Sequence, residues 1–263
     1  MNIHLNPVTP VGTIAKSHPE LLPLFDRMKI DYCCRGHEPL HEACRHAGVD
    51  LLALADAVAE EIESPPASDD EPTTMTQWCD HIEAAHHALA RAVFDRLGVL
   101  MPRILGAHGA RHPRFVELDG VLSGLREEML DHMIREERVL FPWLRRLEQP
   151  GAIHFGPPWS VQRPIDCMKH DHDSVSVALT RVRALTDEYT PPPDACGSVR
   201  ALFETLRDFE ADTRRHIHKE NNILFPAGME AEARMGREVR RHAPTACSHA
   251  ATPASADANA RGK

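Results

Sequence analysis

A pattern of eleven residues that occurs twice constrains the fold of this chain more than any other feature. Residues 132–142 read HMIREERVLFP and residues 216–226 read HIHKENNILFP, and both fit the pattern His-x3-Glu-x3-Leu-Phe-Pro. A further histidine precedes each copy at a similar distance, His87 in the first case and His172 in the second. The chain therefore contains two segments with the same layout, each long enough for a pair of helices.

Apolar side chains around both copies follow the spacing of a helix. Between residues 113 and 148, and again between 198 and 232, they recur at intervals of three and four. This spacing is typical of one buried face of an α-helix. Segments 75–106 and 163–188 complete a set of four helices, and no alternating strand pattern competes with them. The sequence therefore predicts an all-α fold whose larger domain is a four-helix bundle.

Polar and proline-rich stretches divide the chain into domains. Residues 64–74 read SPPASDDEPTT and lack apolar periodicity, which indicates a linker. We expect a small helical domain over residues 1–63, the bundle over 75–235, and a disordered tail of low complexity over 243–263. A unit of roughly 60 residues is marginal on its own, so the small domain should dock on the bundle.

The spacing of the histidines and glutamates predicts that they meet. A hairpin of two helices brings the chain back to its starting height, so the histidine upstream of each copy should face the histidine of the motif. Residues four apart share a helix face, so each motif directs a histidine and a glutamate at one place. The residues that should gather at one level of the core are His87, His132, Glu136, His172, His216 and Glu220. Four imidazoles and two bridging carboxylates suit two iron ions, or another pair of first-row metals, about 3.5–4 Å apart.

A simpler explanation exists for either copy alone. A histidine on an apolar helix face is usually a hydrogen-bonded core residue, and Leu-Phe-Pro packs well at a helix end. However, burying an ionised glutamate without a partner costs several kcal/mol. Because both copies place a histidine and a glutamate in the core, a metal is the most direct compensation.

The composition narrows the class of protein. Eighteen histidines, against eight Phe and two Tyr, point to metal or proton chemistry. The formal net charge of −9 argues against binding to nucleic acid or to an anionic membrane. No run approaches the ~20 apolar residues of a membrane helix, so we expect a soluble, cytoplasmic protein. Seven cysteines without regular spacing indicate reduced thiols rather than a disulfide framework.

Several motifs together make the chain similar to the RIC family (repair of iron centres), bacterial di-iron proteins that respond to nitric oxide and oxidative stress. The resemblance covers about residues 8 to 230. Besides the two repeats it rests on DYCCRG at 31–36, DHIEAAHH at 80–87 and PIDCMKHDHD at 164–173. It implies a hemerythrin-like bundle in which the four histidines named above bind two iron ions and the two glutamates bridge them.

The resemblance also implies a function, with alternatives. The leading expectation is the repair of damaged iron–sulfur clusters by iron donation, by nitric oxide removal, or by both. Partners would then be damaged iron–sulfur proteins, with nitric oxide or oxygen as small ligands and an unspecified electron donor. Whether nitric oxide is reduced to nitrous oxide stays open. The alternatives are a buffer or sensor that binds nitric oxide or oxygen without turnover, and a structural bundle without metal.

The adjacent thiols of Cys33 and Cys34 admit three interpretations: a redox pair, a transient metal-transfer site, or the requirement of a tight turn. We expect them to be partly exposed, with Arg35 favouring the thiolate. Docking of the small domain would bring them towards the metal site. Asp171, where the family often has Glu, should act beside a ligand or along a channel.

Three further histidine motifs are not expected to bind the metal ions. His108 lies 21 residues after His87, about 30 Å along a straight helix, which places it near a hairpin turn. Glu83-x-x-His86 fits the ferritin-type ligand pattern only once, so we interpret it as a coincidence. Residues 37–41, HEPLH, match the zinc-protease pattern, but Pro39 interrupts the helical turn which that site requires.

Overall fold

The structure is a computed structural model that describes residues 3, 5–61, 72–149 and 160–242. All regular secondary-structure elements in these ranges are helical. The ranges also contain a single isolated β-bridge between Pro10 and Pro39. The prediction of an all-α fold is therefore confirmed. The predicted domain boundaries stay predictions, and residues 64–71 of the linker and the tail 243–263 lie outside the described residues.

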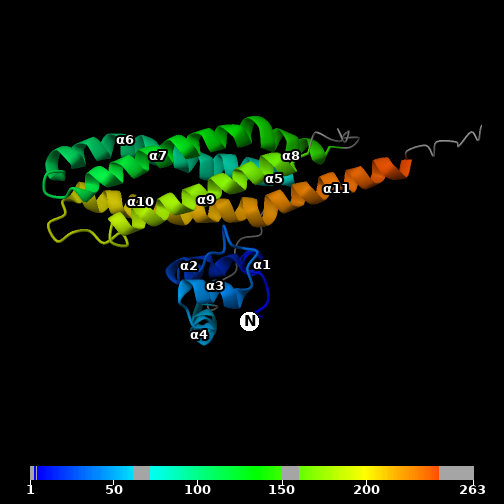
Figure 1. Cartoon of the computed structure of the whole chain (residues 1–263), viewed down its shortest axis with the longest axis horizontal. Helices are drawn as coiled ribbons and strands as arrows, with labels where there is room; N and C mark the ends of the chain where they lie inside the picture. The colour runs from blue at the N-terminus through cyan, green and yellow to red at the C-terminus, as the bar shows by residue number, and fades with distance from the viewer. Residues whose placement is uncertain (1–2, 4, 62–71, 150–159, 243–263) are drawn as a thin grey trace, which may run out of the picture.

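Four long helical columns run antiparallel and form the bundle (Figure 1). In chain order they consist of α5 (Met75–His81), η2 (Ile82–His87) and α6 (Ala88–His108); α7 (Arg114–Arg135), η3 (Glu136–Leu140) and α8 (Phe141–Leu147); α9 (Gln162–Leu185); and α10 (Gly197–Lys219), η4 (Glu220–Leu224) and α11 (Phe225–His242). A capping box between Thr74 and Gln77 begins the first column. The last column continues beyond the predicted end of the bundle at residue 235.

Three of the columns contain a wide π-helical segment, η2, η3 or η4, which the sequence did not predict. Two of them lie in the repeated motif, directly before its Phe-Pro. Pro142 and Pro226 have no N–H to donate to the carbonyl four residues earlier, which interrupts the α-helical ladder and favours the wider turn. Such turns are frequent at functional sites, and here each of them begins or ends at a predicted ligand.

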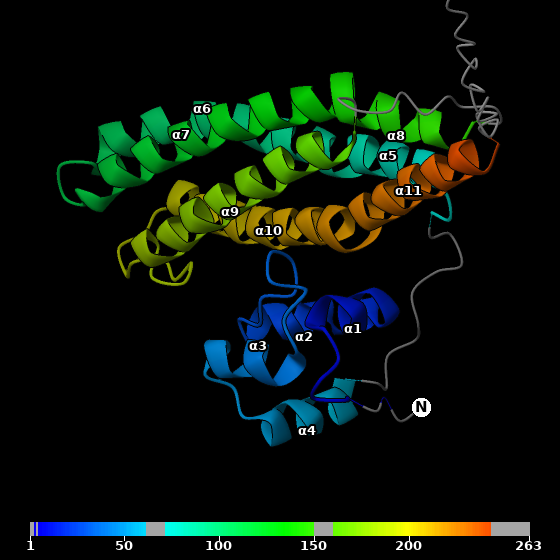
Figure 2. The ribbon, with the colours of Figure 1, turned by 45° about the vertical axis from the view of Figure 1, so that its right-hand side comes forward.

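The N-terminal module, residues 5–61, packs four α-helices and a short 3-10 turn around its own apolar side chains, which include Phe25 and Leu40. The elements are α1 (Val11–Ser17), η1 (Pro19–Leu21), α2 (Leu22–Arg27), α3 (Leu40–Ala47) and α4 (Leu51–Glu61). Gly48 ends α3 with φ of 69°, a left-handed conformation in which glycine is favoured. The module lies against the side of the bundle formed by α9 and α10 (Figure 2), where α1 contacts η4.

The core of the bundle contains two apolar clusters with a polar layer between them. One cluster includes Met133 and Ile217 and extends towards the hairpin turns; the other includes Leu140 and Leu224 and extends towards α8 and α11. The glutamates of both motifs fall between these pairs in the sequence, so the layer is closed by apolar side chains on both sides.

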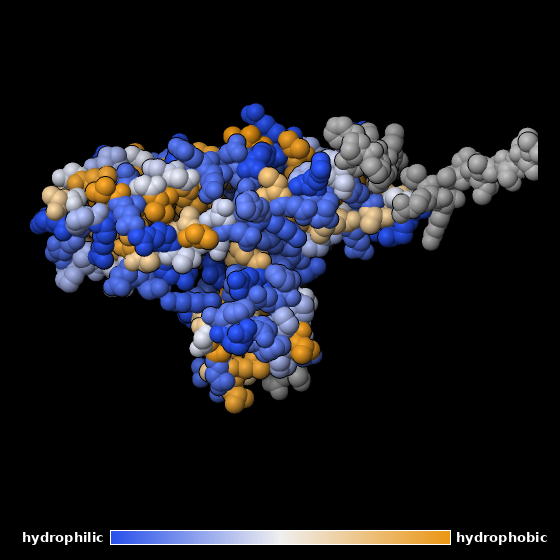
Figure 3. Space-filling model, viewed as in Figure 1, coloured by the Kyte–Doolittle hydropathy of each residue, from blue (hydrophilic) through white to orange (hydrophobic). Residues whose placement is uncertain are grey.

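Hydrophilic residues cover most of the face seen in Figure 3, with apolar residues scattered among them. Among the described helices, none is both long and apolar enough to cross a bilayer.

Candidate metal centre

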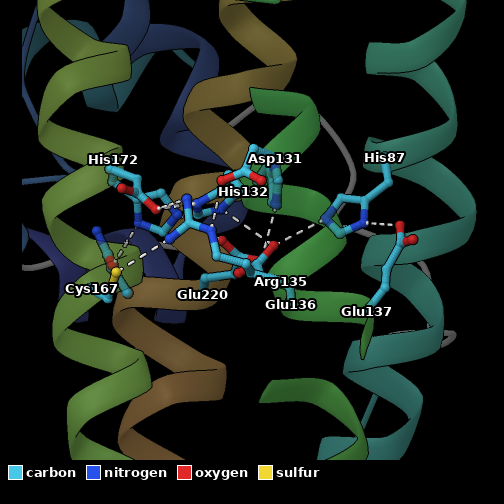
Figure 4. A network of polar contacts seen from close by, with 12 residues as sticks. His87, Asp131, His132, Arg135, Glu136, Glu137, Cys167, His172 and Glu220 are labelled. Atoms are coloured by element: carbon cyan, nitrogen blue, oxygen red, sulfur yellow. Dashed lines mark hydrogen bonds and ion pairs between the residues drawn. The ribbon is translucent and has the colours of Figure 1, made fainter. Parts of the chain in front are cut away.

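All six side chains predicted to meet do so in one layer of the bundle core, and Figure 4 labels five of them. Each comes from one of the four columns, and each is at most 3% exposed. They are His87 at the end of η2, His132 in α7, Glu136 in η3, His172 in α9, His216 in α10 and Glu220 in η4. The wide segments η3 and η4 begin at the two glutamates, and η2 ends at His87. Local helix geometry therefore directs these three side chains inwards.

The six residues form two overlapping groups of four. One group consists of His87, Glu136, His216 and Glu220, and the other of His132, Glu136, His172 and Glu220. Within each group, the nitrogen and oxygen atoms that could bind a metal lie within 4.8 Å of one another. Both carboxylates belong to both groups, so the geometry offers two adjacent metal positions with two shared ligands.

The ring nitrogens lie close to the carboxylates. The Nε2 atoms of His87 and His132 each lie 3.3 Å from Oε2 of Glu136, and those of His172 and His216 lie 3.0 Å from the oxygens of Glu220.

Several of these buried atoms nevertheless have no hydrogen-bond partner. They are Nε2 of His87, His132 and His172, both carboxylate oxygens of Glu136, and Oε2 of Glu220. Leaving a buried polar atom unsatisfied costs about 1–3 kcal/mol. Imidazole nitrogens and carboxylate oxygens are ligands of first-row metals, so the residues present fit a metal that would satisfy these atoms.

Electrostatics also favour a cation in this layer. Burial acts to raise the pKa of Glu220, but the imidazoles of His216 and His172 hold it well below its usual range. Burial and the charge of Glu220 act to raise the pKa of Glu136, and the histidines beside it outweigh both. The pKa of His132 is raised to about 10 because Glu136 and Asp171 outweigh its burial. Both carboxylates are therefore ionised near neutral pH, and the layer attracts positive charge.

Three of the histidines have a partner at their other ring nitrogen, Nδ1. Glu137 lies 2.8 Å from His87, Asp171 lies 3.1 Å from His132, and Oδ1 of Asn221 lies 3.0 Å from His172. In the neutral imidazole, an acceptor at Nδ1 favours the tautomer that presents a lone pair at Nε2, the nitrogen that faces the centre.

Of these partners, only Asp171 is predicted from the sequence to lie beside a ligand. Glu137 and Asn221 were missed, although both directly follow a motif glutamate. Comparing this position between the repeats would have found them.

His86 is a further buried residue that the sequence analysis missed. Its ring stacks on that of His216 with the centroids 5.4 Å apart, and its Nδ1 lies 2.9 Å from Asp212. Burial outweighs this carboxylate and lowers the pKa of His86 to about 4. Glu83 instead pairs with Arg145, so Glu83 and His86 do not form a ligand pair.

The two adjacent cysteines lie in the loop between α2 and α3, docked against the bundle. Sγ of Cys34 lies 3.8 Å from the backbone oxygen of His172 and 3.9 Å from Sγ of Cys33. Asp31 accepts hydrogen bonds from the Cys33 thiol and from the backbone N–H of Cys34, and these three residues form another group able to hold a metal. Docking therefore brings the thiols towards the centre, as the sequence analysis expected.

The expected exposure of Cys33 was wrong. Its side chain is buried, and the hydrogen bond with Cys34, together with burial, raises the pKa of the Cys33 thiol well above its ordinary value. The cation that acts to lower the pKa of the Cys33 thiol is Arg214, whereas the guanidinium of Arg35 lies beside Glu38 and His46.

The remaining histidine motifs lie outside the layer. His108 ends α6 at the hairpin turn, where its Nε2 lies 3.1 Å from Sγ of Cys196. Pro39 directly precedes α3, so His37 lies outside the helix that contains His41 and the two cannot form a zinc-protease site.

Two family models match the chain. The model described as hemerythrin HHE cation binding domain matches residues 79–227, and the one described as a domain of unknown function (DUF542) matches residues 8–64. The iron-sulfur cluster repair protein YtfE of Yersinia pseudotuberculosis serotype IB (strain PB1/+) is 30% identical over 223 residues, which cover 84% of this chain and 97% of that protein. The protein of the same name from Yersinia pestis (strain Pestoides F) matches to the same extent.

The chain belongs to the RIC family. This confirms that the bundle is hemerythrin-like and that a small helical unit precedes it. The matched cation-binding domain contains all six residues of the layer, which supports a metal-binding site in this domain. The N-terminal module has a family model of its own, the DUF542 model, which matches residues 8–64 and ends before the bundle begins.

Proposed function

We propose that this chain binds two iron ions and repairs iron–sulfur clusters damaged by nitrosative or oxidative stress. The observation that carries the proposal is the pair of four-residue groups that share Glu136 and Glu220 in a fully buried layer. The relatives named iron-sulfur cluster repair proteins support the repair function. Damaged iron–sulfur proteins are then its partners.

Each side chain has a defined task in this proposal. His87 and His216 would hold one metal ion, while His132 and His172 would hold the other. Glu136 and Glu220, both fully buried, would be shared between the two ions and would balance their charge. When bound, iron with imidazole and carboxylate ligands has accessible ferrous and ferric states and can keep a coordination position open for a small ligand.

The surroundings favour nitric oxide or oxygen as that small ligand. The layer is closed by apolar clusters on both sides, so a diatomic gas reaches it more easily than a polar or larger molecule. This same observation favours the second candidate function, a buffer or sensor that binds the gas without turnover.

Iron donation would need a group that receives the departing metal ion, and the vicinal thiols of Cys33 and Cys34 are candidates for that role. Cys34 lines a cavity of about 520 Å³ between the N-terminal module and α9, together with Asp31 and Asp173. Thiol and carboxylate groups at this place could receive a metal ion that leaves the centre, or Cys33 and Cys34 could supply electrons. We propose the transfer or redox role for the pair rather than a purely conformational one.

One experiment separates repair from buffering. The reduced, iron-loaded protein receives nitric oxide without oxygen, while nitrosyl spectra and nitrous oxide are followed, and is then mixed with an enzyme whose iron–sulfur cluster has been damaged. Repair predicts that the enzyme regains activity with the wild-type chain and not with Glu220→Leu. A stoichiometric nitrosyl signal, with neither nitrous oxide nor recovered enzyme, would instead establish the buffer.

A further inference from the structure

The side chain of Asn221 forms hydrogen bonds in two directions, one towards the metal-binding layer and one towards the N-terminal module. Its Oδ1 lies 3.0 Å from Nδ1 of His172, and its Nδ2 donates to the backbone oxygen of Cys33 at 3.2 Å. A carbonyl oxygen can only accept, so the NH₂ end of the amide must face Cys33. The oxygen end then faces His172, whose Nδ1 must carry the proton, and this leaves the lone pair at Nε2 for a metal.

The loop that contains Cys33 is held tightly against the same part of the bundle. Asn222 donates from Nδ2 to the backbone oxygen of Tyr32 at 3.1 Å. A Cβ atom added to Gly36 would lie 2.2 Å from Oδ1 of Asn222, so the loop approaches as closely as glycine allows. Arg214 donates to the backbone oxygen of Ile30 at 2.7 Å and also pairs with the module's Asp26. The position of the Cys33 carbonyl therefore depends on how the module docks.

The corresponding contacts of His87 and His132 do not involve the module. Glu137 beside His87 pairs with Arg91, and Asp171 beside His132 pairs with Arg135, all within the bundle. Among these three Nδ1 contacts, that of His172 alone uses a neutral amide.

The chemistry explains this difference. Asn221 takes the place in the second repeat that Glu137 takes in the first. A carboxylate there could accept from a histidine but could not donate to Cys33. The amide makes both contacts, and it couples His172 to the module at the cost of a weaker acceptor.

We propose that Asn221 is a positioning residue through which the Cys33–Cys34 loop controls how firmly the metal ion at His132 and His172 is held. The inference rests on the proposed di-iron function and deepens it. When the loop is displaced, Asn221 loses the contact that orients it and His172 loses its fixed tautomer. Within the part of the chain that the structure describes, the Nδ1 contact of His87 stays inside the bundle, so we expect the ion position at His87 and His216 to be less sensitive to the module. A partner that engages Cys34 would thereby loosen one ion of the two.

The test measures iron release in the full-length protein, loaded with ferrous iron under nitrogen and then mixed with the chelator ferrozine. Loss of an outer partner of a metal ligand typically lowers metal affinity about 10–100-fold. Asn221→Ala should therefore lose one iron per chain about 10-fold faster than the wild type, with the second unchanged. Asn221→Asp, which keeps the acceptor, should stay close to the wild-type rate. Asn222→Ala is the comparison variant: it removes contacts with the backbone oxygens of Tyr32 and Cys33 but none with His172, so it should speed the loss of that iron less than Asn221→Ala does.

A double variant tests the connection itself and does not depend on the folding of Asn221→Ala. Gly36→Ala should displace the loop and speed the loss of one iron, whereas Gly36→Ala combined with Asn221→Asp should release iron as slowly as Asn221→Asp alone. The melting temperature of each metal-free variant reports separately on folding.

Three results would overturn the inference: wild-type release from Asn221→Ala, equal acceleration by Asn222→Ala, or an effect of Gly36→Ala that Asn221→Asp does not remove. If the wild-type chain holds no iron, the proposed function fails and this inference fails with it. If it holds two and the variants do not differ, only the role of Asn221 fails.

Discussion

Glu136 and Glu220 lie opposite each other in the buried layer, with ligand oxygens within 4.8 Å and neither side chain exposed to solvent. Two ionised carboxylates at this separation repel each other strongly in a medium of low polarity. The surrounding histidines compensate only in part, since several of the facing atoms have no hydrogen-bond partner. Two metal ions between the carboxylates and the imidazoles would satisfy all of these groups at once.

Removing either shared carboxylate should therefore affect both metal positions. We expect Glu136→Leu and Glu220→Leu to lower the iron content and to abolish any absorption of a bridged metal pair, measured by metal analysis and visible spectroscopy. His41→Ala, in an exposed part of α3, is the control and should change neither. If His41→Ala emptied the site while Glu220→Leu spared it, the assignment would be wrong.

Removal of the metal should destabilise the bundle. A ligand at 100 times its Kd adds about 2.7 kcal/mol to the free energy of unfolding. In a domain of this size that amount lowers the melting temperature by roughly 5–10 °C when the metal is removed. Calorimetry of the loaded and chelator-treated protein checks this, with Glu220→Leu as the control in which the two curves should nearly coincide. Identical melting of both wild-type forms would show that the metal stabilises nothing.

Docking of the N-terminal module depends on Gly12 in α1. A Cβ atom there would lie 2.5 Å from the side chain of Asn222 and 2.9 Å from the backbone of Gly36. Because overpacking typically costs about 1–3 kcal/mol, Gly12→Ala should lower the urea midpoint of unfolding. Gly98→Ala is the matched control on α6: nothing lies within 4 Å of its added Cβ, and alanine favours the helix. Equal midpoints for the two variants would mean that the close approach at Gly12 does not matter.

The exposed thiol of Cys196 should react at neutral pH. Backbone N–H groups at the start of α10, Val199 first among them, and the imidazole of His108 lower its pKa from 9.0 to about 7. Below that pH the thiol is protonated and slow, and above it the thiolate reacts. Alkylation by iodoacetamide, followed by mass spectrometry of the Cys196 peptide, should show a midpoint of about 7. His108→Ala should move the midpoint upwards; a midpoint near 9 in the wild type would refute the prediction.

The six residues of the layer could be predicted from the sequence because the repeat fixes two things at once. The spacing within His-x3-Glu places both side chains on one helix face, and the distance to His87 or His172 fits one helical hairpin. The helical nature of the four columns and their order along the chain follow from the same periodicity. None of this needs contacts between distant parts of the chain.

The features that the sequence missed depend on such distant contacts. Burial of Cys33 results from docking against the bundle, so its neighbour Arg35 gave a misleading signal. Two of the wide turns, η3 and η4, lie directly before a Phe-Pro whose proline lacks an N–H, and apolar periodicity alone does not reveal any of the three. His86 and Asn221 each contact a histidine ring on another helix, His216 and His172 respectively. Only the packed structure brings these pairs together.

X-ray absorption spectroscopy of the iron-loaded protein, combined with its iron content, tests the central claim most directly. Two ions bridged by Glu136 and Glu220 predict two irons per chain, with iron scattering from a neighbour about 3.5–4 Å away and imidazole scattering around each. A single iron per chain, or two irons without scattering from each other, would contradict the shared-carboxylate centre.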